Sequence, residues 1–356
     1  MVWRSEGMQA MGEGELIGAL DARATRREER RAFFGQALGA VAAGGAMVAA
    51  SRAGAQTATP TPTPSPSATA TSTLGVSDYL NFALNLEYLE ANFYAFAVNG
   101  AAIGTGLQGG VTTTGAQGAA TGGRRVAFTD PVVAQFAREI AADELAHVTF
   151  LRSAIGSLAV AQPAIDLSPA GAFTAAARAA GVVGANETFD PYASDENFLL
   201  AAFLFEDVGV TAYKGTTGRL ANSTLLEATQ GILAVEAYHA AMIRTTLYRK
   251  GIETPALRLI EKTQQLSDAR DRLDGSATEN LVTGYATDDD QGITPGTNDA
   301  GETVSNIVPL NGNGLAYSRT GDRVLNILYL NQAAVGTGGF FPAGVNGAIR
   351  TSAAAT

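Results

Sequence analysis

The sequence contains two histidines, and each of them ends a Glu-x-x-His motif. The motifs run from Glu144 to His147 and from Glu236 to His239. Residues i and i+3 share one face of an α-helix, so each motif would present a carboxylate and an imidazole together. Both lie on apolar helical stripes, where a buried carboxylate is costly unless it is paired or binds a metal. This pattern restricts the chain to folds in which polar partners meet between buried helices.

Four segments have the hydrophobic periodicity of long helices. Their expected starts, in chain order, are Ser77, Thr129-Asp130-Pro131, Ser194 and Asn222 or Ser223. The first is expected to stop at Asn99-Gly100. The fourth is expected to end at 249–251, where basic residues suit the helix dipole and Gly251 suits a left-handed cap.

The connections indicate how these helices are arranged. A few residues around Gly218 join the third and fourth segments, which predicts antiparallel neighbours. Residues 157–193 separate the second and third, and this length is enough to cross a bundle. The sequence therefore predicts an all-α, ferritin-like four-helix bundle over residues 76–251, with a long crossover between helices two and three. A Gly-rich insertion at 100–126 is expected to be a surface loop.

Each of the four helices carries a glutamate on its apolar stripe. Dinuclear bundles of this kind use one Glu from each of two helices and Glu-x-x-His from each of the other two. The expected ligands of two metal ions are Glu87, Glu144, His147, Glu206, Glu236 and His239. Glu90 is the alternative ligand on the first helix. The alternative for the whole set is that the carboxylates pair with arginines and the histidines are ordinary core residues.

A weak internal repeat favours Glu87 over Glu90. Glu87 precedes Tyr94 by the same interval at which Glu206 precedes Tyr213. The residues expected around the ligands are Glu90, Tyr94, Asp143 and Tyr213. Asp143 is a candidate acceptor for the second N–H of a ligating imidazole, whereas ordinary core packing is the alternative for the tyrosines.

Ligands that are all carboxylate oxygen or imidazole nitrogen suit iron or manganese. Glu144 and Glu236 are expected to bridge the two ions, with Glu87 and Glu206 as terminal ligands. The absence of cysteine excludes thiolate sites and disulfides. A net charge of −10 disfavours binding to nucleic acid.

Residues 1–55 have the order of a secretory signal. Arg30-Arg31 precedes two phenylalanines, an apolar run follows at 37–50, and Ala53-Gly54-Ala55 offers a cleavage site. The paired arginines predict export by the twin-arginine route to the periplasm or beyond, with a mature chain that begins near Gln56. The alternative is a basic stretch before a buried helix. The apolar run is too short to span a bilayer, so no membrane span is expected in the mature chain. Residues 56–75, rich in Thr, Pro and Ser, are expected to form a semi-rigid linker.

Several segments resemble the ferritin-like family that includes the plant desiccation-related proteins and many exported bacterial relatives. They are NFALNLEYLEANFYAF, EIAADELAHVTFLRSAIG, FLFEDVGVTAYKG, AVEAYHAAMIRTTLYRKG, AYSRTGDRVLNILYL and GGFFPAGVNGAIR. The resemblance covers residues 76–350 and implies the bundle and the dinuclear ligands at the positions named above. It implies a link to stress tolerance rather than one defined reaction. The chain departs from the pattern at Val235, which precedes Glu236 where Asp143 precedes Glu144, so asymmetric surroundings are expected.

Residues 252–356 are expected to hold one more helix and a Gly/Asn-rich extension. The helix should open at Thr254-Pro255 and close at Gly275, and a short helical pattern covers 323–330. Residues 288–290 are three aspartates that lack the spacing of a calcium loop and are expected to form a solvated turn. Phe340-Phe341 is expected to dock either on the bundle or on a neighbouring subunit.

Three functions fit the sequence. The leading hypothesis is an exported iron or manganese protein that reacts with oxygen or peroxide, as a ferroxidase or a catalase. The second is a non-catalytic stress or structural protein with a stabilising metal site. Iron storage in a cage is the third, and the insertion, crossover and extension argue against a compact shell. The sequence leaves open whether the chain forms a homo-oligomer.

Overall fold

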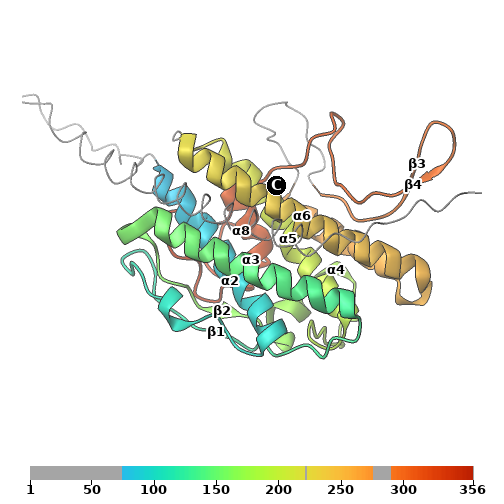
Figure 1. Cartoon of the computed structure of the whole chain (residues 1–356), viewed down its shortest axis with the longest axis horizontal. Coiled ribbons are helices and arrows are strands. Elements are labelled where there is room, and N and C mark those ends of the chain that lie inside the picture. Colours follow the sequence, from blue (N-terminus) through green and yellow to red (C-terminus); the bar gives the residue numbers. More distant parts are fainter. Residues whose placement is uncertain (1–73, 221–222, 276–289, 356) are drawn as a thin grey trace, which may run out of the picture. The chain divides into compact units, whose positions relative to one another are not determined.

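Four long helices dominate the part of the chain that the computed structural model describes, which is residues 74–220, 223–275 and 290–355 (Figure 1). They are α2 (Val76–Asn99), α3 (Pro131–Ile155), α5 (Asp195–Thr217) and α6 (Ser223–Glu253). The expected export signal, its cleavage site and the linker up to residue 73 lie outside these ranges. No helix within the ranges has both the length and the hydropathy needed to cross a membrane.

The helices pack as two antiparallel pairs. In the first pair, Asn81 near the start of α2 donates to the carbonyl of Leu158 just beyond α3, at 3.0 Å. In the second pair, Lys250 near the end of α6 donates to Glu196 at the start of α5, at 2.9 Å. The long crossover between the pairs gives the all-α bundle that the sequence predicts. Its interior is lined by large apolar side chains from all four helices.

Local sequence signals set most of the helix ends. The Asp130 carboxylate accepts a hydrogen bond from the amide of Val132 at 2.9 Å, and Pro131 occupies the first helical position. The Ser194 hydroxyl accepts from the amide of Asn197 at 3.2 Å, as expected. Gly100 ends α2 with a φ of 76°, a conformation that glycine adopts without strain.

Two helix ends differ from expectation. Gly75 rather than Ser77 precedes α2, and the carboxylate of Asp78 accepts from the Gly75 amide at 2.8 Å. At the other end of the bundle, α6 continues through Gly251 to Glu253. A side chain at Gly251 would meet Ile260 at 3.0 Å, so the glycine permits close packing of the next helix instead of ending this one.

The insertion at 100–126, expected to be a surface loop, is held against the crossover at 157–193. The insertion contains a 3-10 turn (Thr105–Leu107) and β1 (Ala120–Thr121), which pairs in parallel with β2 (Ile165–Asp166) of the crossover. Ile103 and Val126 in the insertion are buried. The insertion is therefore a packed part of the fold and not only a surface loop. The crossover also contains a 3-10 turn (Gly156–Leu158), a π-helical turn (Pro169–Phe173) and α4 (Thr174–Ala180).

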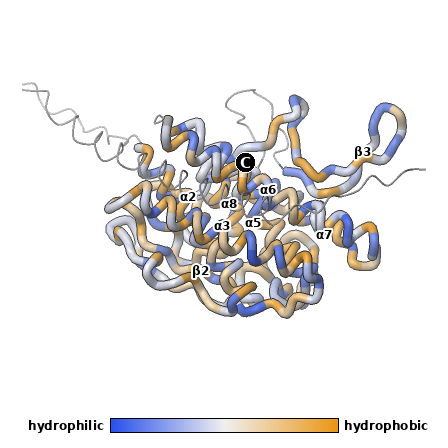
Figure 2. Tube along the Cα trace, in the orientation of Figure 1, coloured by the Kyte–Doolittle hydropathy of each residue, from blue (hydrophilic) through white to orange (hydrophobic). Residues whose placement is uncertain are grey.

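The C-terminal extension folds onto the bundle. It contains a 3-10 turn (Pro255–Leu257), α7 (Leu259–Asp274), the antiparallel pair β3 (Gly296–Thr297) and β4 (Thr303–Val304), and α8 (Gly321–Tyr329). Hydrophilic residues are frequent on α7 and on the hairpin of β3 and β4 (Figure 2). The ring of Phe340 lies 5.0 Å from that of Phe205 on α5 and 5.1 Å from that of Phe173. Of the two expectations for the Phe340 segment, docking on its own bundle is the one observed.

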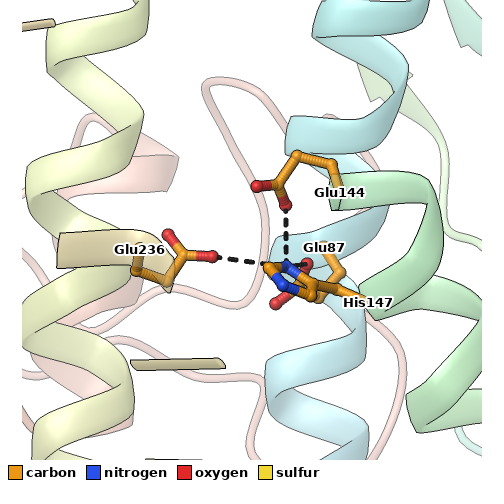
Figure 3. Close-up of side chains that lie close together, drawn as sticks. All are labelled: Glu87, Glu144, His147 and Glu236. Atoms are coloured by element: carbon orange, nitrogen blue, oxygen red, sulfur yellow. Dashed lines mark ion pairs between the residues drawn. The ribbon is translucent and has the colours of Figure 1, made fainter. Parts of the chain in front are cut away.

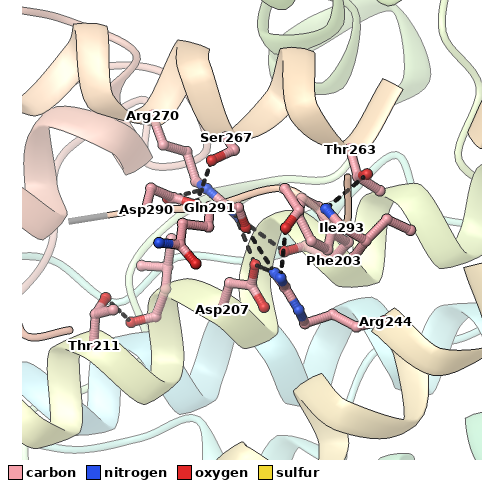
Figure 4. A network of polar contacts seen from close by, with 12 residues as sticks. Phe203, Asp207, Thr211, Arg244, Thr263, Ser267, Arg270, Asp290, Gln291 and Ile293 are labelled. Carbon is pink, nitrogen blue, oxygen red and sulfur yellow. Dashed lines mark hydrogen bonds and ion pairs between the residues drawn. The ribbon is translucent and has the colours of Figure 1, made fainter. Parts of the chain in front are cut away.

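A network of buried charges fixes this extension to the bundle (Figure 4). Arg244 of α6 and Arg270 of α7 both donate to the carboxylate of Asp207 on α5, at 2.8 and 2.9 Å. Asp290 in turn accepts from Arg270 at 2.6 Å and from Arg319 at 3.1 Å. Arg319 also donates to Asp274 at 2.6 Å, so three arginines face three aspartates. These contacts join α5 and α6 of the bundle to the extension, and each charge is compensated by an opposite one.

Asp290 corrects the expectation of a solvated turn. It is 5% exposed, and Arg270 and Arg319 lower the pKa of its carboxyl despite the opposing effect of burial. The other two aspartates of the triplet lie outside the described residues. An isolated run of aspartates gave no indication of the distant arginines that pair with Asp290.

Candidate metal centre

The six expected ligands converge in the middle of the bundle. Glu87 comes from α2, Glu206 from α5, and the two Glu-x-x-His motifs from α3 and α6. Each helix turns the apolar stripe that carries its glutamate toward the core, which is why the glutamates meet. All four carboxylates are fully buried. The ligand-type atoms of these residues form two groups in which all atoms lie within 4.8 Å of one another.

The first group surrounds His147 (Figure 3). Its Nδ1 lies 3.2 Å from Oε2 of Glu87, 3.4 Å from Oε2 of Glu144 and 3.7 Å from Oε1 of Glu236. Three helices therefore supply three carboxylates to one imidazole nitrogen. This is a donor set of the kind that holds a divalent first-row metal.

The second group surrounds His239. Its Nδ1 lies 3.0 Å from Oε1 of Glu144 and 3.4 Å from Oε2 of Glu206. Glu144 belongs to both groups and offers a different oxygen to each, which is the geometry expected of a bridging carboxylate. Glu236 was expected to bridge as well, but in this geometry it belongs only to the group of His147.

The two tyrosines of the internal repeat each bind a glutamate of the opposite helix pair. Tyr94 of α2 donates to Oε1 of Glu206 on α5, and Tyr213 of α5 donates to Oε1 of Glu87 on α2. In both cases Oε1 is occupied by the tyrosine, while Oε2 faces a histidine Nδ1. The tyrosines thus orient one free oxygen of each glutamate toward the centre and do more than fill the core.

Asp143 lies where a partner for a ligating imidazole was expected. Its Oδ2 is 3.2 Å from Nε2 of His239, the nitrogen that points away from the cluster. The contact crosses from α3 to α6. It leaves Nδ1 of His239 to face Glu144 and Glu206.

Glu90 lies beside the cluster without joining either group. It is 3% exposed, and a Cβ placed on Gly209 of α5 would lie 3.3 Å from its Oε1 and 2.2 Å from Oε2 of Glu236. Gly209 therefore makes room for two carboxylates. The sequence predicts Gly209 on the inner stripe of the third helix but does not predict this role. The signal that could have indicated it is a glycine in the middle of a helix, where glycine is unfavourable, one turn after Glu206.

Burial dominates the titration of the carboxyl groups. It raises the pKa of Glu87 to about 7. Burial, helped by neighbouring carboxylates, also raises the pKa of Glu90 and Glu236 well above the ordinary value. The pKa of Glu206 is also raised, chiefly by burial. Glu144 is the exception: the two histidines outweigh burial and hold its pKa well below the usual range.

The histidines shift in the opposite direction from ordinary buried imidazoles. Burial alone would lower their pKa values, but carboxylates outweigh it. Glu87 and Glu144 raise the pKa of His147 to about 11. Asp143, Glu144 and Glu206 raise that of His239 to about 12. Protons therefore compete with metal for both imidazoles at neutral pH.

The evidence that these six residues fit two metal ions is a set of buried polar atoms without a well-formed hydrogen bond. Buried polar atoms in proteins nearly always have one. Among the described residues, eight buried atoms of the six candidate ligands have no hydrogen bond of good geometry, although the histidine nitrogens lie in ion-pair contact with several of the carboxylate oxygens: Oε2 of Glu87, both oxygens of Glu144 and of Glu236, Oε2 of Glu206, and Nδ1 of both histidines. These are the atoms that point into the centre, so the donor set fits two cations.

Comparisons with known proteins agree with this architecture. A family model described as the ferritin-like domain matches residues 75–249. The chain is 32% identical over 257 residues to the desiccation-related protein PCC13-62 of Craterostigma plantagineum, which covers 69% of this chain and 75% of the relative. It is 29% identical over 276 residues to the ferritin-like catalase Nec2 of Nesocodon mauritianus, which covers 76% of this chain and 84% of the relative. No solved structure shows a significant match.

Proposed function

We propose that this chain, which belongs to the ferritin-like family that includes the desiccation-related proteins, is a dinuclear iron or manganese protein that removes peroxide or reduces oxygen. The observation that carries the proposal is the set of eight buried ligand atoms that lack hydrogen bonds and converge from four helices. Ordinary core residues would have polar partners outside the cluster, whereas these atoms face one another, with histidine Nδ1 at 3.0–3.7 Å from the carboxylate oxygens. The name of one relative, a ferritin-like catalase, favours peroxide as the substrate.

The chain's own residues supply binding, orientation and shielding. Glu144 is shared between the two groups, so it would hold two cations close together. Tyr94 and Tyr213 keep the free oxygens of Glu206 and Glu87 pointed inward. Two bound metal ions of this kind would supply the capacity to exchange electrons with peroxide or oxygen. The surrounding apolar core keeps bulk water and larger molecules away, which restricts the substrate to a small oxidant.

Turnover by the loaded protein tests this proposal. The metal-free full chain is loaded anaerobically with manganese(II) or iron(II), and hydrogen peroxide or oxygen is added while dissolved oxygen and absorbance are followed. Oxygen release from peroxide by the manganese form is the expected result. Glu236→Gln should reduce turnover strongly, and Glu227→Gln, an exposed glutamate on the same helix, should leave it unchanged. Metal binding without turnover on either oxidant would contradict the proposed reaction.

A second candidate is a non-catalytic stress protein whose metal ions stabilise the bundle. It is favoured by the relative named only as desiccation-related and by the near-complete burial of the centre. Under this function, metal loading would raise the melting temperature while peroxide consumption stayed at the level of free metal ion. Iron storage remains the least favoured function, because the extension and insertion pack around the bundle.

The cellular setting is part of the proposal. The paired arginines and the apolar run of residues 30–50 support export by the twin-arginine route, to a periplasmic or extracellular site. The acidic chain would bind small oxidants and no nucleic acid, and assembly into a homo-oligomer is open to test by light scattering. N-terminal sequencing of exported material should give a start near Gln56.

A further inference from the structure

The two halves of the centre correspond through the internal repeat but differ at one position. Asp143 precedes Glu144 on α3, whereas Val235 precedes Glu236 on α6. We propose that this difference makes the two metal positions unequal, with a tight position at His239 and a weaker, more accessible one at His147 that fills last. The inference rests on the proposed dinuclear function and assigns Asp143 as a positioning residue for one ligand only.

The contacts across the bundle follow one rule. Tyr94 of the first helix pair binds Glu206 of the second, and Tyr213 of the second pair binds Glu87 of the first. Each half therefore orients a ligand of the other half. Asp143 obeys the same rule, because it reaches from α3 in the first pair to a histidine on α6 in the second.

His239 is held through both ring nitrogens. Nε2 is 3.2 Å from the Asp143 carboxylate, while Nδ1 faces Glu144 at 3.0 Å. A carboxylate on the outer nitrogen fixes the tautomer, so that the inner nitrogen keeps its lone pair for a metal, and it increases the basicity of the ligand. The ring is also deeply buried, with 2% of its side chain exposed.

His147 lacks the corresponding contact. By the rule above its partner would come from position 235, where a valine has no polar atom. Within the described ranges, no hydrogen bond reaches Nε2 of His147, and 10% of its side chain is exposed. His147 is therefore oriented only by the contacts that its Nδ1 makes within the cluster. The outer edge of its ring is closer to solvent than that of His239.

The size of the effect follows from what such outer partners contribute elsewhere. Loss of a carboxylate behind a ligating histidine typically lowers metal affinity by about 10- to 100-fold. The two loading steps of this centre should differ by about this factor, apart from two further effects. Repulsion between the two cations also weakens the second step, and Glu236, the third carboxylate at the His147 position, opposes the difference. Substitutions at Asp143 and Val235 separate the effect of the outer carboxylate from cation repulsion, because they change only the group behind each histidine.

The experiment is a calorimetric titration of the metal-free full chain with manganese(II), repeated with cobalt(II) to follow the visible absorption of each equivalent. The wild type should bind one ion tightly and a second ion more weakly. Asp143→Asn should weaken the first step by about 10- to 100-fold and change the cobalt spectrum of the first equivalent. Glu139→Gln, an exposed acidic residue one turn earlier on α3, should change neither step.

The converse variant adds the missing carboxylate. Val235→Asp should strengthen the second step and bring it closer to the first. Ala234→Asp adds the same charge at an exposed neighbouring position of α6 and should have little effect. If Val235→Asp does not fold, Asp143→Asn still decides, because the Asp143 side chain is 44% exposed and its replacement is isosteric.

Two results would overturn the inference. One is a wild type that fills both positions with equal affinity; the other is a first step that Asp143→Asn leaves unchanged in both affinity and spectrum. A chain that binds no manganese or cobalt would overturn it together with the proposed function. Two unequal steps that respond to Asp143→Asn, without turnover of peroxide or oxygen, would support the inference while contradicting the proposed reaction.

Discussion

Raising the pH should destabilise the metal-free protein, and Glu87 shows why. The folded state raises the pKa of its carboxyl to about 7 from an ordinary value of 4.5, chiefly through burial. The folded chain therefore binds this proton more tightly than the unfolded chain does. The resulting stability is complete below the unfolded pKa and is lost as the pH rises through the folded value.

The magnitude follows from the shift. Each pKa unit corresponds to ~1.36 kcal/mol, so the raised pKa of Glu87 accounts for about 3 kcal/mol in total. About 2 kcal/mol of this would be lost between pH ~5.5 and pH ~8. For a domain of this size that loss lowers the melting temperature by about 4–8 °C.

The histidines act in the same direction. Their pKa values are raised to about 11 and about 12, since neighbouring carboxylates outweigh burial, so their contribution is also lost as the pH rises above 6.5. Glu144, whose pKa is lowered by the histidines, acts oppositely but only below its unfolded value of 4.5. The sign of the effect near neutral pH is therefore fixed.

Scanning calorimetry of chelator-treated protein across this pH range measures the effect. Glu87→Gln cannot titrate and should show a smaller slope, whereas the exposed Glu227→Gln should keep the wild-type slope. Added manganese should stabilise the protein more at pH 8 than at pH 5.5, because metal must displace protons from the ligands. A metal-free melting temperature that stays constant or rises with pH would show that these groups do not bind protons more tightly in the folded chain.

Three substitutions test other parts of the account. Phe340→Ala should lower the unfolding free energy by about 3–5 kcal/mol, measured by denaturant titration, because it opens a cavity against the aromatic core. Arg270→Met should cost about 3–5 kcal/mol in the same assay, because it leaves the carboxylate of Asp207 with one arginine fewer in a buried network, and a wild-type midpoint would contradict that role. Gly209→Ala should weaken metal binding in a titration, because the new Cβ displaces the carboxylate of Glu236; unchanged affinity would show that this carboxylate moves freely.

The bundle and its centre were predictable because periodicity and spacing are local signals. A glutamate on an apolar stripe has few ways to be satisfied, and two Glu-x-x-His motifs limit them further. Helix starts are also local signals, because one or two residues are enough to cap a helix. Asp130 followed by Pro131 begins α3 in this way, and Ser194 begins α5. The matching intervals from Glu87 to Tyr94 and from Glu206 to Tyr213 favoured Glu87 over Glu90 as the ligand of the first helix, and Tyr94 donates a hydrogen bond to Glu206.

Features that depend on distant partners could not be predicted. Asp290 can be buried because Arg270 and Arg319, from other elements, pair with its carboxylate. The residues next to Asp290 in the sequence do not indicate these partners. Gly251 lies inside its helix, where it allows the close approach of Ile260 from the next helix. The pairing of β1 with β2 involves two residues on each side, too few to give a periodic signal.

The metal content of the purified protein decides whether this cluster is a dinuclear centre. We expect two iron or manganese ions per chain by elemental analysis after loading and removal of free metal. Glu144→Gln should reduce this number, because Glu144 serves both groups of ligands, and Glu227→Gln should retain two. A wild-type chain that holds no stoichiometric metal under any loading condition would show that the cluster is not a metal centre.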